Sequence, residues 1–301
     1  MEPVQRDFLD PAIITRLGHL TLHARTPMLG SVSGRHRSPH RGSSVEFAEY
    51  RKYVPGDDPR RLDWRAYGRT DRFYVKEFEA DTNLRLMAVM DTSGSMRYQG
   101  TDTTKLEYGK RLLSTLMYLA SQQGDAIGLT CAAKGIDRQV PTRRSGAHLR
   151  AVLDELTQIE AQGDTGLVAA LHAVAEQTPQ RALVVIVSDL FVSPAELADC
   201  FQHLRFRRHD VAVFHLLEDQ ELDFRFDRPT RFVDLEGGPS LLVEPNVIHR
   251  EYAAALQQYL HDLDVAVREA AIDYHRVRIN ESYGEVLARF LIGRTPRRAG
   301  R

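Results

Sequence analysis

The sequence predicts an α/β fold with a doubly wound, mainly parallel sheet flanked by helices, an N-terminal helix and a small β/loop module. Apolar runs of strand length alternate with segments of helical period over residues 84–217, which is the pattern of repeated β-α-β units. One run, residues 182–187, is continuously apolar, as expected for a strand covered on both faces. The length of 301 residues and the hydrophobic content of 43% suit one large domain with an added module.

The N-terminal part, residues 1–83, is expected to contain a helix followed by a cassette of strands and loops. A rough helical period over residues 11–25 predicts a helix that docks one face on a core. His19 and His23 are four residues apart in it, a spacing that some metal sites use. No third ligand accompanies them, so a solvated or capping role is the preferred interpretation.

A basic, turn-rich stretch follows at residues 28–42 and is expected to form a loop. Its arginines, from Arg35 to Arg41, suggest either an anion or nucleic-acid contact or a basic surface that pairs with an acidic element. The second interpretation is preferred because no aromatic residues are interleaved with the arginines.

Residues 45–81 combine aromatic side chains with closely spaced acids and bases, which favours a salt-bridged lid over an open charged face. Asp57 and Asp58 follow the turn signal Pro55-Gly56. Adjacent aspartates do not by themselves converge on one ion, so a structural turn is preferred over a second cation site or a catalytic pair. Residues 74–78 predict a strand that leads into the core.

The main domain is expected at residues 84–245. Strands are predicted at residues 84–90, 125–132, 182–187 and 210–217, with a further strand at 137–141 that pairs with the second of them. A capping box at Thr104 and Glu107 predicts a helix that ends near Gly124. Further helices are expected around residues 149–156, after Thr165, and after Ser193, where Pro194 and Glu196 strengthen the N-terminal signal.

The C-terminal part is expected to be mainly helical. Short apolar pieces beyond Glu218 predict an edge hairpin or one last strand. Residues 246–293 should form helices that pack on the domain: a long amphipathic helix at 246–274 and a short one at 283–291. Residues 294–301 form a basic tail that is expected to be disordered.

Composition limits the classes of function. A formal net charge of -1 gives no general attraction to nucleic acid or to anionic lipid. Cys131 and Cys200 lie in apolar segments without metal-ligand spacing, so both are expected to be buried, reduced thiols, which is compatible with the cytoplasm. No stretch approaches the roughly 20 apolar residues that a membrane-spanning helix needs. We therefore expect a cytoplasmic protein that binds no nucleic acid and has no membrane span.

Oxygen-bearing side chains mark one edge of the predicted sheet. Asp91, Ser93 and Ser95 follow the strand at 84–90, Thr165 precedes a helix, and Asp189 follows the strand at 182–187. Ligands of open α/β sheets bind beyond the carboxyl ends of the strands, and oxygen ligands suit a hard divalent cation such as Mg²⁺ or Mn²⁺. Alternatively, each residue has a structural role as a helix cap or loop former. Metal binding is preferred because all five occur together.

This set resembles the metal-ion-dependent adhesion site of von Willebrand factor A domains, whose pattern is D-x-S-x-S, a distant Thr and a distant Asp. The resemblance covers residues 84 to about 242. It implies that the hydroxyls of Ser93, Ser95 and, in some states, Thr165 contact the metal, and that Asp91 and Asp189 act largely through water. Such an ion stays electrophilic, so an acidic side chain of a partner protein can complete its coordination.

The preceding cassette, EYRKYVPGDDPRRLDWRAYGRTDRFYVKEFEAD, resembles the bacterial domain-of-unknown-function 58 family, in which it precedes a von Willebrand A-like sheet. Many members resemble membrane-anchored proteins with apolar N-terminal spans, and this chain lacks such spans. Members commonly accompany MoxR-type AAA+ ATPases, so the resemblance implies such a partner.

Two classes of function compete. The first is a non-enzymatic, metal-dependent protein–protein interaction module that acts with an ATPase in protein assembly, maturation or remodelling. The second is a metal-dependent hydrolase or phosphotransferase with Asp91 as the nucleophile. Such phosphotransferases place a second carboxylate two positions on, as general acid, where this chain has Ser93, which protonates a leaving group poorly. We therefore prefer the interaction module.

Overall fold

The structure is a computed structural model, and it describes residues 8–25, 46–53, 63–70, 72–79, 84–178, 181–226 and 228–295. The chain divides into two compact units, one formed by residues 1–23 and 85–301 and the other by residues 24–84. Arg35 to Arg41, Asp57, Asp58 and the tail beyond residue 295 lie outside the described residues. The domain boundaries expected from the sequence stay predictions.

The smaller unit contains an antiparallel pair of strands, β1 (Glu46–Lys52) and β2 (Tyr74–Glu79), and the helix α2 (Trp64–Thr70). Asp63 caps this helix by accepting a hydrogen bond from the Ala66 amide at 3.1 Å, as N-terminal aspartates do. The rings of Tyr67 and Phe73 stack at 4.4 Å. The strand predicted at 74–78 exists, but it pairs with β1 and does not join the main sheet.

The larger unit is built on a six-stranded sheet in the order β10-β7-β6-β3-β4-β5. All neighbouring strands are parallel except β5, which pairs antiparallel with β4. The strands are β3 (Arg85–Asp91), β4 (Ala126–Ala133), β5 (Gly135–Arg143), β6 (Leu183–Ser188), β7 (Asp210–Leu217) and β10 (Asp273–Arg278). Every residue of β6 and β7 is buried, because both faces of the sheet are covered. The predicted fold class is confirmed.

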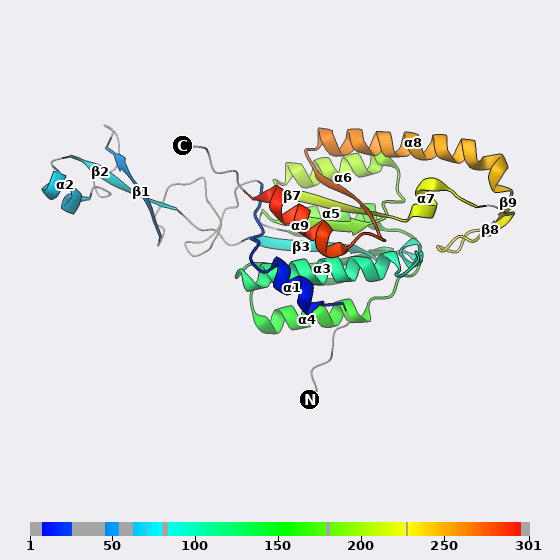
Figure 1. Cartoon of the computed structure of the whole chain (residues 1–301), viewed down its shortest axis with the longest axis horizontal. Coiled ribbons are helices and arrows are strands. Elements are labelled where there is room, and N and C mark those ends of the chain that lie inside the picture. The colour runs from blue at the N-terminus through cyan, green and yellow to red at the C-terminus, as the bar shows by residue number, and fades with distance from the viewer. Residues whose placement is uncertain are drawn as a thin grey trace, which may run out of the picture. The chain divides into compact units, whose positions relative to one another are not determined.

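Helices cover the two faces (Figure 1). The helices α1 (Pro11–Leu17), α3 (Lys105–Gln122), α4 (Gly146–Gln158) and α9 (Tyr283–Arg294) lie on one face. The other face packs under α5 (Leu167–Gln177), α6 (Pro194–Phe206) and α8 (Pro245–Glu269), whose apolar residues form one cluster with β3 and β6. The predicted cap of α3 is present, since Thr104 accepts a hydrogen bond from the Glu107 amide at 3.1 Å.

Four short elements also belong to the described part of the larger unit. The helix α7 (Asp219–Asp223) follows β7, and the strands β8 (Thr230–Phe232) and β9 (Leu241–Val243) form an antiparallel pair outside the main sheet. The sequence predicts an edge hairpin or one last strand beyond Glu218; a hairpin is present there, but it does not lie at an edge of the main sheet. A one-turn 3-10 helix, η2 (Gly94–Arg97), follows β3.

Two predicted helix ends are wrong. The first helix stops at Leu17, and His19 is exposed to solvent. The helix predicted at 246–274 ends at Glu269, after which Ala271 adopts a left-handed backbone (φ 51°) and β10 begins. The β10 sequence DYHRVR is polar and half-exposed because it is an edge strand, so its apolar signal is weak.

The final helix is held by a buried ion-pair cluster. Arg294, expected in the tail, is the last residue of α9, and its guanidinium donates to Asp273 at 2.8 Å and to Asp210 at 2.9 Å. Both free cysteines, Cys131 and Cys200, are buried, as predicted.

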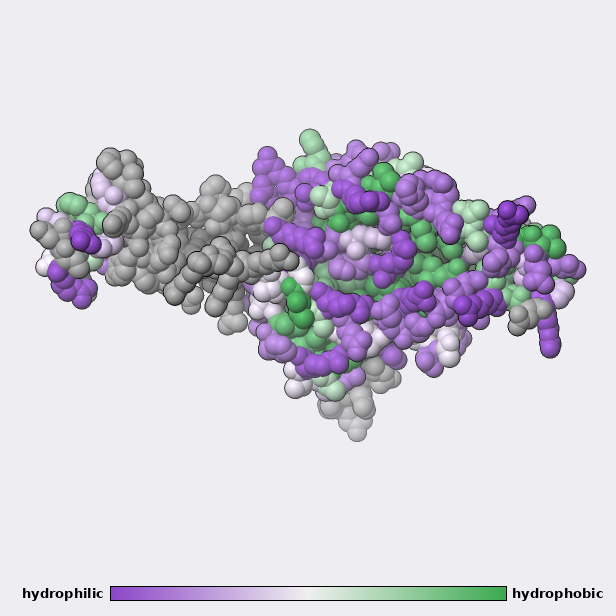
Figure 2. All heavy atoms as spheres, turned by 45° about the horizontal axis from the view of Figure 1, so that its top comes forward, coloured by the Kyte–Doolittle hydropathy of each residue, from purple (hydrophilic) through white to green (hydrophobic). Residues whose placement is uncertain are grey.

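The surface on the side of α8 is mostly hydrophilic, with smaller hydrophobic areas between the charged residues (Figure 2). Within the part of the chain that the structure describes, no helix combines the length and the apolar character that crossing a membrane requires.

Candidate metal centre

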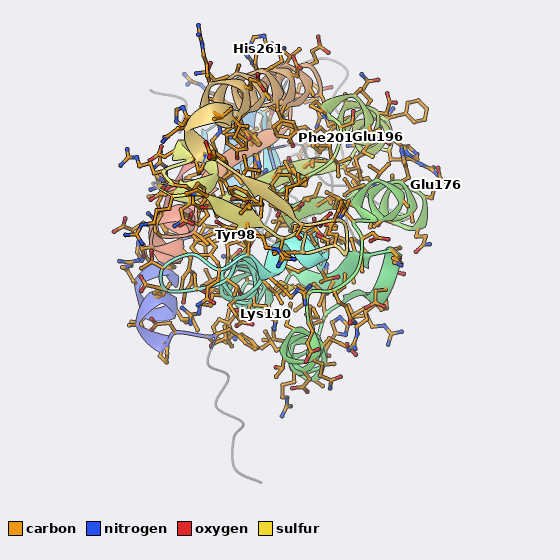
Figure 3. The ribbon with its side chains drawn as sticks, turned by 90° about the vertical axis from the view of Figure 1, so that its right-hand side faces the viewer. Tyr98, Lys110, Glu176, Glu196, Phe201 and His261 are labelled. Carbon is orange, nitrogen blue, oxygen red and sulfur yellow. The ribbon has the colours of Figure 1, made fainter. Side chains whose placement is uncertain are left out.

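The two predicted aspartates come together because their strands are neighbours. Asp91 is the last residue of β3, and Asp189 directly follows β6, which lies beside β3 in parallel register with Met90 opposite Val187. Carboxyl ends of parallel strands meet at one edge of a sheet. Figure 3 looks onto that end of the larger unit, where Tyr98, which follows η2, lies near the centre of the view.

The two serines link the aspartates through hydrogen bonds. The Ser93 amide donates to Asp91 Oδ1 at 3.0 Å. The hydroxyls of Ser93 and Ser95 are 3.0 Å apart, and the Ser95 hydroxyl donates to Asp189 Oδ1 at 3.3 Å. Four of the five predicted ligands therefore form one connected set.

Thr165 lies in a loop that is tied to the serine loop by backbone hydrogen bonds. The Gly94 amide donates to the Gly163 carbonyl and the Gln162 amide donates to the Thr92 carbonyl, both at 2.9 Å. Gly166 is required at the next position, since a Cβ there would stand 2.0 Å from the Ala133 carbonyl oxygen. Sequence spacing alone does not reveal this close approach.

The Thr165 hydroxyl has no structural use in the described chain. The N-cap of α5 is Gly166, so the alternative interpretation of Thr165 as a helix cap is wrong. Its Oγ1 atom is buried and has no hydrogen-bond partner among the described residues. An unpaired buried hydroxyl costs about 1–3 kcal/mol, and a metal ligand role would offset that cost.

Hydrogen bonds hold the Asp91 carboxylate in place, and its surroundings disfavour its negative charge. It is 1% exposed, and its Oδ2 accepts a hydrogen bond from the Ser188 hydroxyl. Burial, followed by the negative charge of Asp189, raises the pKa of Asp91 from 3.8 to about 6. A buried carboxylate with both oxygens engaged suits an outer ligand better than a nucleophile that must reach a substrate.

A buried lysine, which sequence reasoning missed, adjoins Asp189. Lys105, the first residue of α3, is 0% exposed. Its Nζ lies 3.0 Å from Asp189 Oδ2 and 2.6 Å from Glu221 Oε1. Burial lowers the pKa of Lys105, but the charges of Asp189 and Glu221 outweigh it, so the pKa is raised and the ammonium stays charged.

The charges of these groups leave room for a divalent cation. Asp91, Asp189 and Glu221 carry three formal negative charges when ionised, and Lys105 supplies one positive charge. These four groups keep a net charge of -2, and a divalent ion would offset this negative charge. Together with the unpartnered Thr165 hydroxyl, this balance makes the site a good fit for Mg²⁺ or Mn²⁺.

The donor set is rich in hydroxyls and poor in charged ligands. Nowhere in the described ranges do three His, Cys, Asp or Glu side chains gather as a metal cluster. An ion here would therefore be bound mainly by the hydroxyls of Ser93, Ser95 and Thr165, which leaves it able to accept a further carboxylate.

A groove of about 660 Å³ begins beside the candidate metal centre. Thr165 lies at one end of it, the first turns of α5 form one wall, and Phe191 and Glu196 line the other side. Phe191 is 57% exposed. Figure 3 labels Glu196 of α6 and Glu176, near the end of α5, at this side of the unit.

Comparison with known proteins gives relatives of undetermined function and several similar structures. Proteins of Mycobacterium tuberculosis and Mycobacterium bovis, both described as uncharacterized, are 24% identical over 295 residues, which covers 96% of this chain and 92% of theirs. The conserved hypothetical protein BatB from Bacteroides thetaiotaomicron is 17% identical with a TM-score of 0.48, covering 70% of this chain and 98% of BatB. The SpRpn10 VWA domain is 12% identical with a TM-score of 0.42, covering 73% of this chain and 99% of that domain.

The family comparison agrees with the resemblance carried by the cassette and the sheet. The family model described as "Protein of unknown function DUF58" matches residues 49–260, well over half of the sequence. The match begins in the aromatic cassette of the smaller unit and ends within α8. The chain therefore belongs to the DUF58 family.

Proposed function

We propose that this protein is a non-enzymatic, divalent-metal-dependent protein–protein interaction module. The observation that carries the proposal is the buried, unpartnered Thr165 hydroxyl, in a loop bonded to the one that holds Ser93 and Ser95. Hydroxyl oxygens that are withdrawn from water and left without a partner are costly unless a ligand uses them.

Each residue has a distinct role in the proposed site. Ser93, Ser95 and Thr165 would hold Mg²⁺ or Mn²⁺ through their hydroxyls, and Asp91 and Asp189 would hold it largely through water. The bound ion would supply a Lewis-acidic position for a carboxylate of the partner protein. Lys105 fixes the orientation of Asp189 and limits the negative charge that would otherwise repel that carboxylate.

The groove beside Thr165 extends the proposed contact. A partner segment whose acidic residue reaches the metal would place its neighbouring residues between α5 and the exposed ring of Phe191. Exposed aromatic rings are frequent anchors at interfaces.

The proposed partner is a MoxR-type AAA+ ATPase, with a joint role in the assembly, maturation or remodelling of other proteins. Membership of the DUF58 family supports this choice, because the family resemblance implies such an ATPase. The ATPase would supply the mechanical work, and the module would recognise its partner through the metal.

Replacing Thr165 with valine is expected to weaken Mg²⁺ binding about tenfold or more, because a ligand oxygen is lost. Valine has nearly the same shape, so the metal-free protein should keep its stability or gain about 1 kcal/mol from removal of the unpaired hydroxyl. Calorimetric titration with Mg²⁺ and urea unfolding in EDTA measure the two effects. Thr165→Ser, which keeps the oxygen, is the matched control, and equal Mg²⁺ affinity of the valine and serine variants would refute the assignment.

Binding to the MoxR-type ATPase is expected to weaken on chelation with EDTA and in Thr165→Ala. A pull-down with the purified ATPase measures the amount of ATPase bound. Adding Mg²⁺ back after EDTA is the control, because it should restore binding if chelation has not damaged the protein. Retention of the same amount of ATPase under both perturbations would show that the metal is not the contact.

A further inference from the structure

The loop between β8 and β9, residues 233–240, approaches the candidate metal centre. The Leu235 carbonyl oxygen would stand 2.3 Å from a Cβ added to Gly94, so only glycine allows this approach. The same carbonyl accepts a hydrogen bond from Arg97 Nη2 at 2.8 Å. Gly94 and Arg97 belong to η2, which holds Ser95. The loop is thus docked on the element that carries one of the predicted ligands.

The loop has a defined turn. Asp234 Oδ1 accepts a hydrogen bond from the Glu236 amide at 2.7 Å, as aspartates do at the start of turns. Gly237 has a left-handed backbone (φ 100°), and a Cβ on Gly238 would stand 2.2 Å from Asp234 Oδ2. Paired strands close the base of the loop, with Thr230 opposite Val243. Together these features define the backbone position of Glu236.

Glu236 points at the candidate metal centre. Its Oε1 is buried and has no hydrogen-bond partner among the described residues. Burial and the negative charge of Asp189 raise the pKa of Glu236, whereas hydrogen bonds from the Thr165 amide and from the hydroxyl and amide of Ser95 lower it. Three of the five predicted metal ligands are therefore the neighbours of this carboxylate.

We propose that Glu236 is an additional ligand of the metal, supplied by the chain itself, and that it occupies the position at which a partner's carboxylate binds. This inference rests on the proposed function. Without a cation, the partly buried Glu236 carboxylate lies near the Asp189 carboxylate, and its Oε1 atom is buried without a hydrogen-bond partner among the described residues, which is unfavourable for two like charges. A divalent ion between Glu236 and the serine and threonine hydroxyls resolves that repulsion.

Exposed apolar side chains flank the loop that carries Glu236. Val233, Leu241 and Leu242 are 61%, 62% and 76% exposed. A hydrophobic area is visible at the right-hand end of Figure 2, the end at which β8 and β9 are drawn in Figure 1.

Mn²⁺ binding to the full chain tests the proposal, with free Mn²⁺ measured by electron paramagnetic resonance and bound water by proton relaxation. Glu236→Ala is expected to weaken Mn²⁺ affinity about tenfold and to raise the relaxation enhancement of the bound ion, because water takes the vacated position. Acetate, a small carboxylate probe, should lower this enhancement in Glu236→Ala and leave the wild type unchanged. Glu244→Ala, at an exposed glutamate beyond β9, is the matched control.

The failure of this inference is distinguishable from that of the proposed function. If Mn²⁺ binds the wild type and is lost in Asp91→Ala, but Glu236→Ala leaves both affinity and relaxation unchanged, Glu236 is not a ligand. An equal effect of acetate on the wild type and Glu236→Ala would also overturn the inference. If Mn²⁺ binds neither the wild type nor Glu236→Ala, the metal site itself is refuted.

Discussion

Asp91→Asn is expected to abolish stabilisation by Mg²⁺ and, at the same time, to make the metal-free protein more stable at pH 8. A ligand present at a hundred times its dissociation constant stabilises the folded wild type by about 2.7 kcal/mol, a melting shift of about 5–10 °C for a unit of this size. Asparagine keeps the shape of the side chain but lacks the charge that attracts the ion. Differential scanning calorimetry with Mg²⁺ and with EDTA measures both effects.

The gain in metal-free stability follows from the raised pKa of Asp91. Since the pKa of Asp91 is about 6 in the folded state, above the ordinary aspartate value of 3.8, the folded state keeps a proton between these pH values that the unfolded state has lost. The contribution of Asp91 to stability therefore falls as pH rises through this window, and it is fully unfavourable above pH 6. The asparagine variant should exceed the wild type by about 1–3 kcal/mol at pH 8, with the difference vanishing near pH 4.

Metal binding should show the matching pH dependence. Below about pH 6 protons compete with Mg²⁺ for Asp91 in the wild type, so its melting shift should shrink. Asp164→Asn is the control, because Asp164 adjoins Thr165 but is exposed, and its ion pair within the described residues is with the exposed Lys134 at 3.5 Å. Equal melting shifts with Mg²⁺ in Asp91→Asn and Asp164→Asn would contradict the site assignment.

Lys105→Met is expected to destabilise the metal-free protein by about 3–5 kcal/mol, because removing one partner leaves the buried charges of Asp189 and Glu221 uncompensated. Mg²⁺ should restore part of this loss, since a divalent cation replaces some of the missing positive charge next to Asp189. The stabilisation by Mg²⁺ should therefore be larger in the variant than in the wild type. Urea unfolding with and without Mg²⁺ measures the difference.

Lys110→Met on the same helix is the matched control. Lys110 is also buried, but its ion pair among the described residues is with the half-exposed Glu107 at 3.0 Å. The Glu107 carboxylate stays in contact with water when the lysine is replaced, so the loss of stability should be smaller than in Lys105→Met. Figure 3 labels Lys110 on α3. If the two lysine variants lost the same stability, the special role of Lys105 at the site would be wrong.

Local signals in the sequence were sufficient for most of the larger unit. The apolar runs of β3, β6 and β7 are strong because these strands are buried on both faces, and Thr104 with Glu107 marks the start of α3. Local signals were insufficient to predict elements that are only partly buried. The edge strand β10 is rich in charged residues and partly exposed, so the apolar alternation that marks a strand is weak in it. The helix α2 is short and rich in charged and aromatic residues, so it shows no clear apolar helical period.

By itself, the sequence determined the fold class and the residue types of the candidate metal centre, because the D-x-S-x-S pattern places oxygen-bearing side chains directly after a strand. Only the tertiary structure decided which distant groups surround those residues. Lys105, Glu221 and Glu236 reach the site from α3, α7 and the β8–β9 loop. No local period encodes their convergence, since it depends on the order of strands in the sheet and on backbone contacts at Gly94 and Gly166.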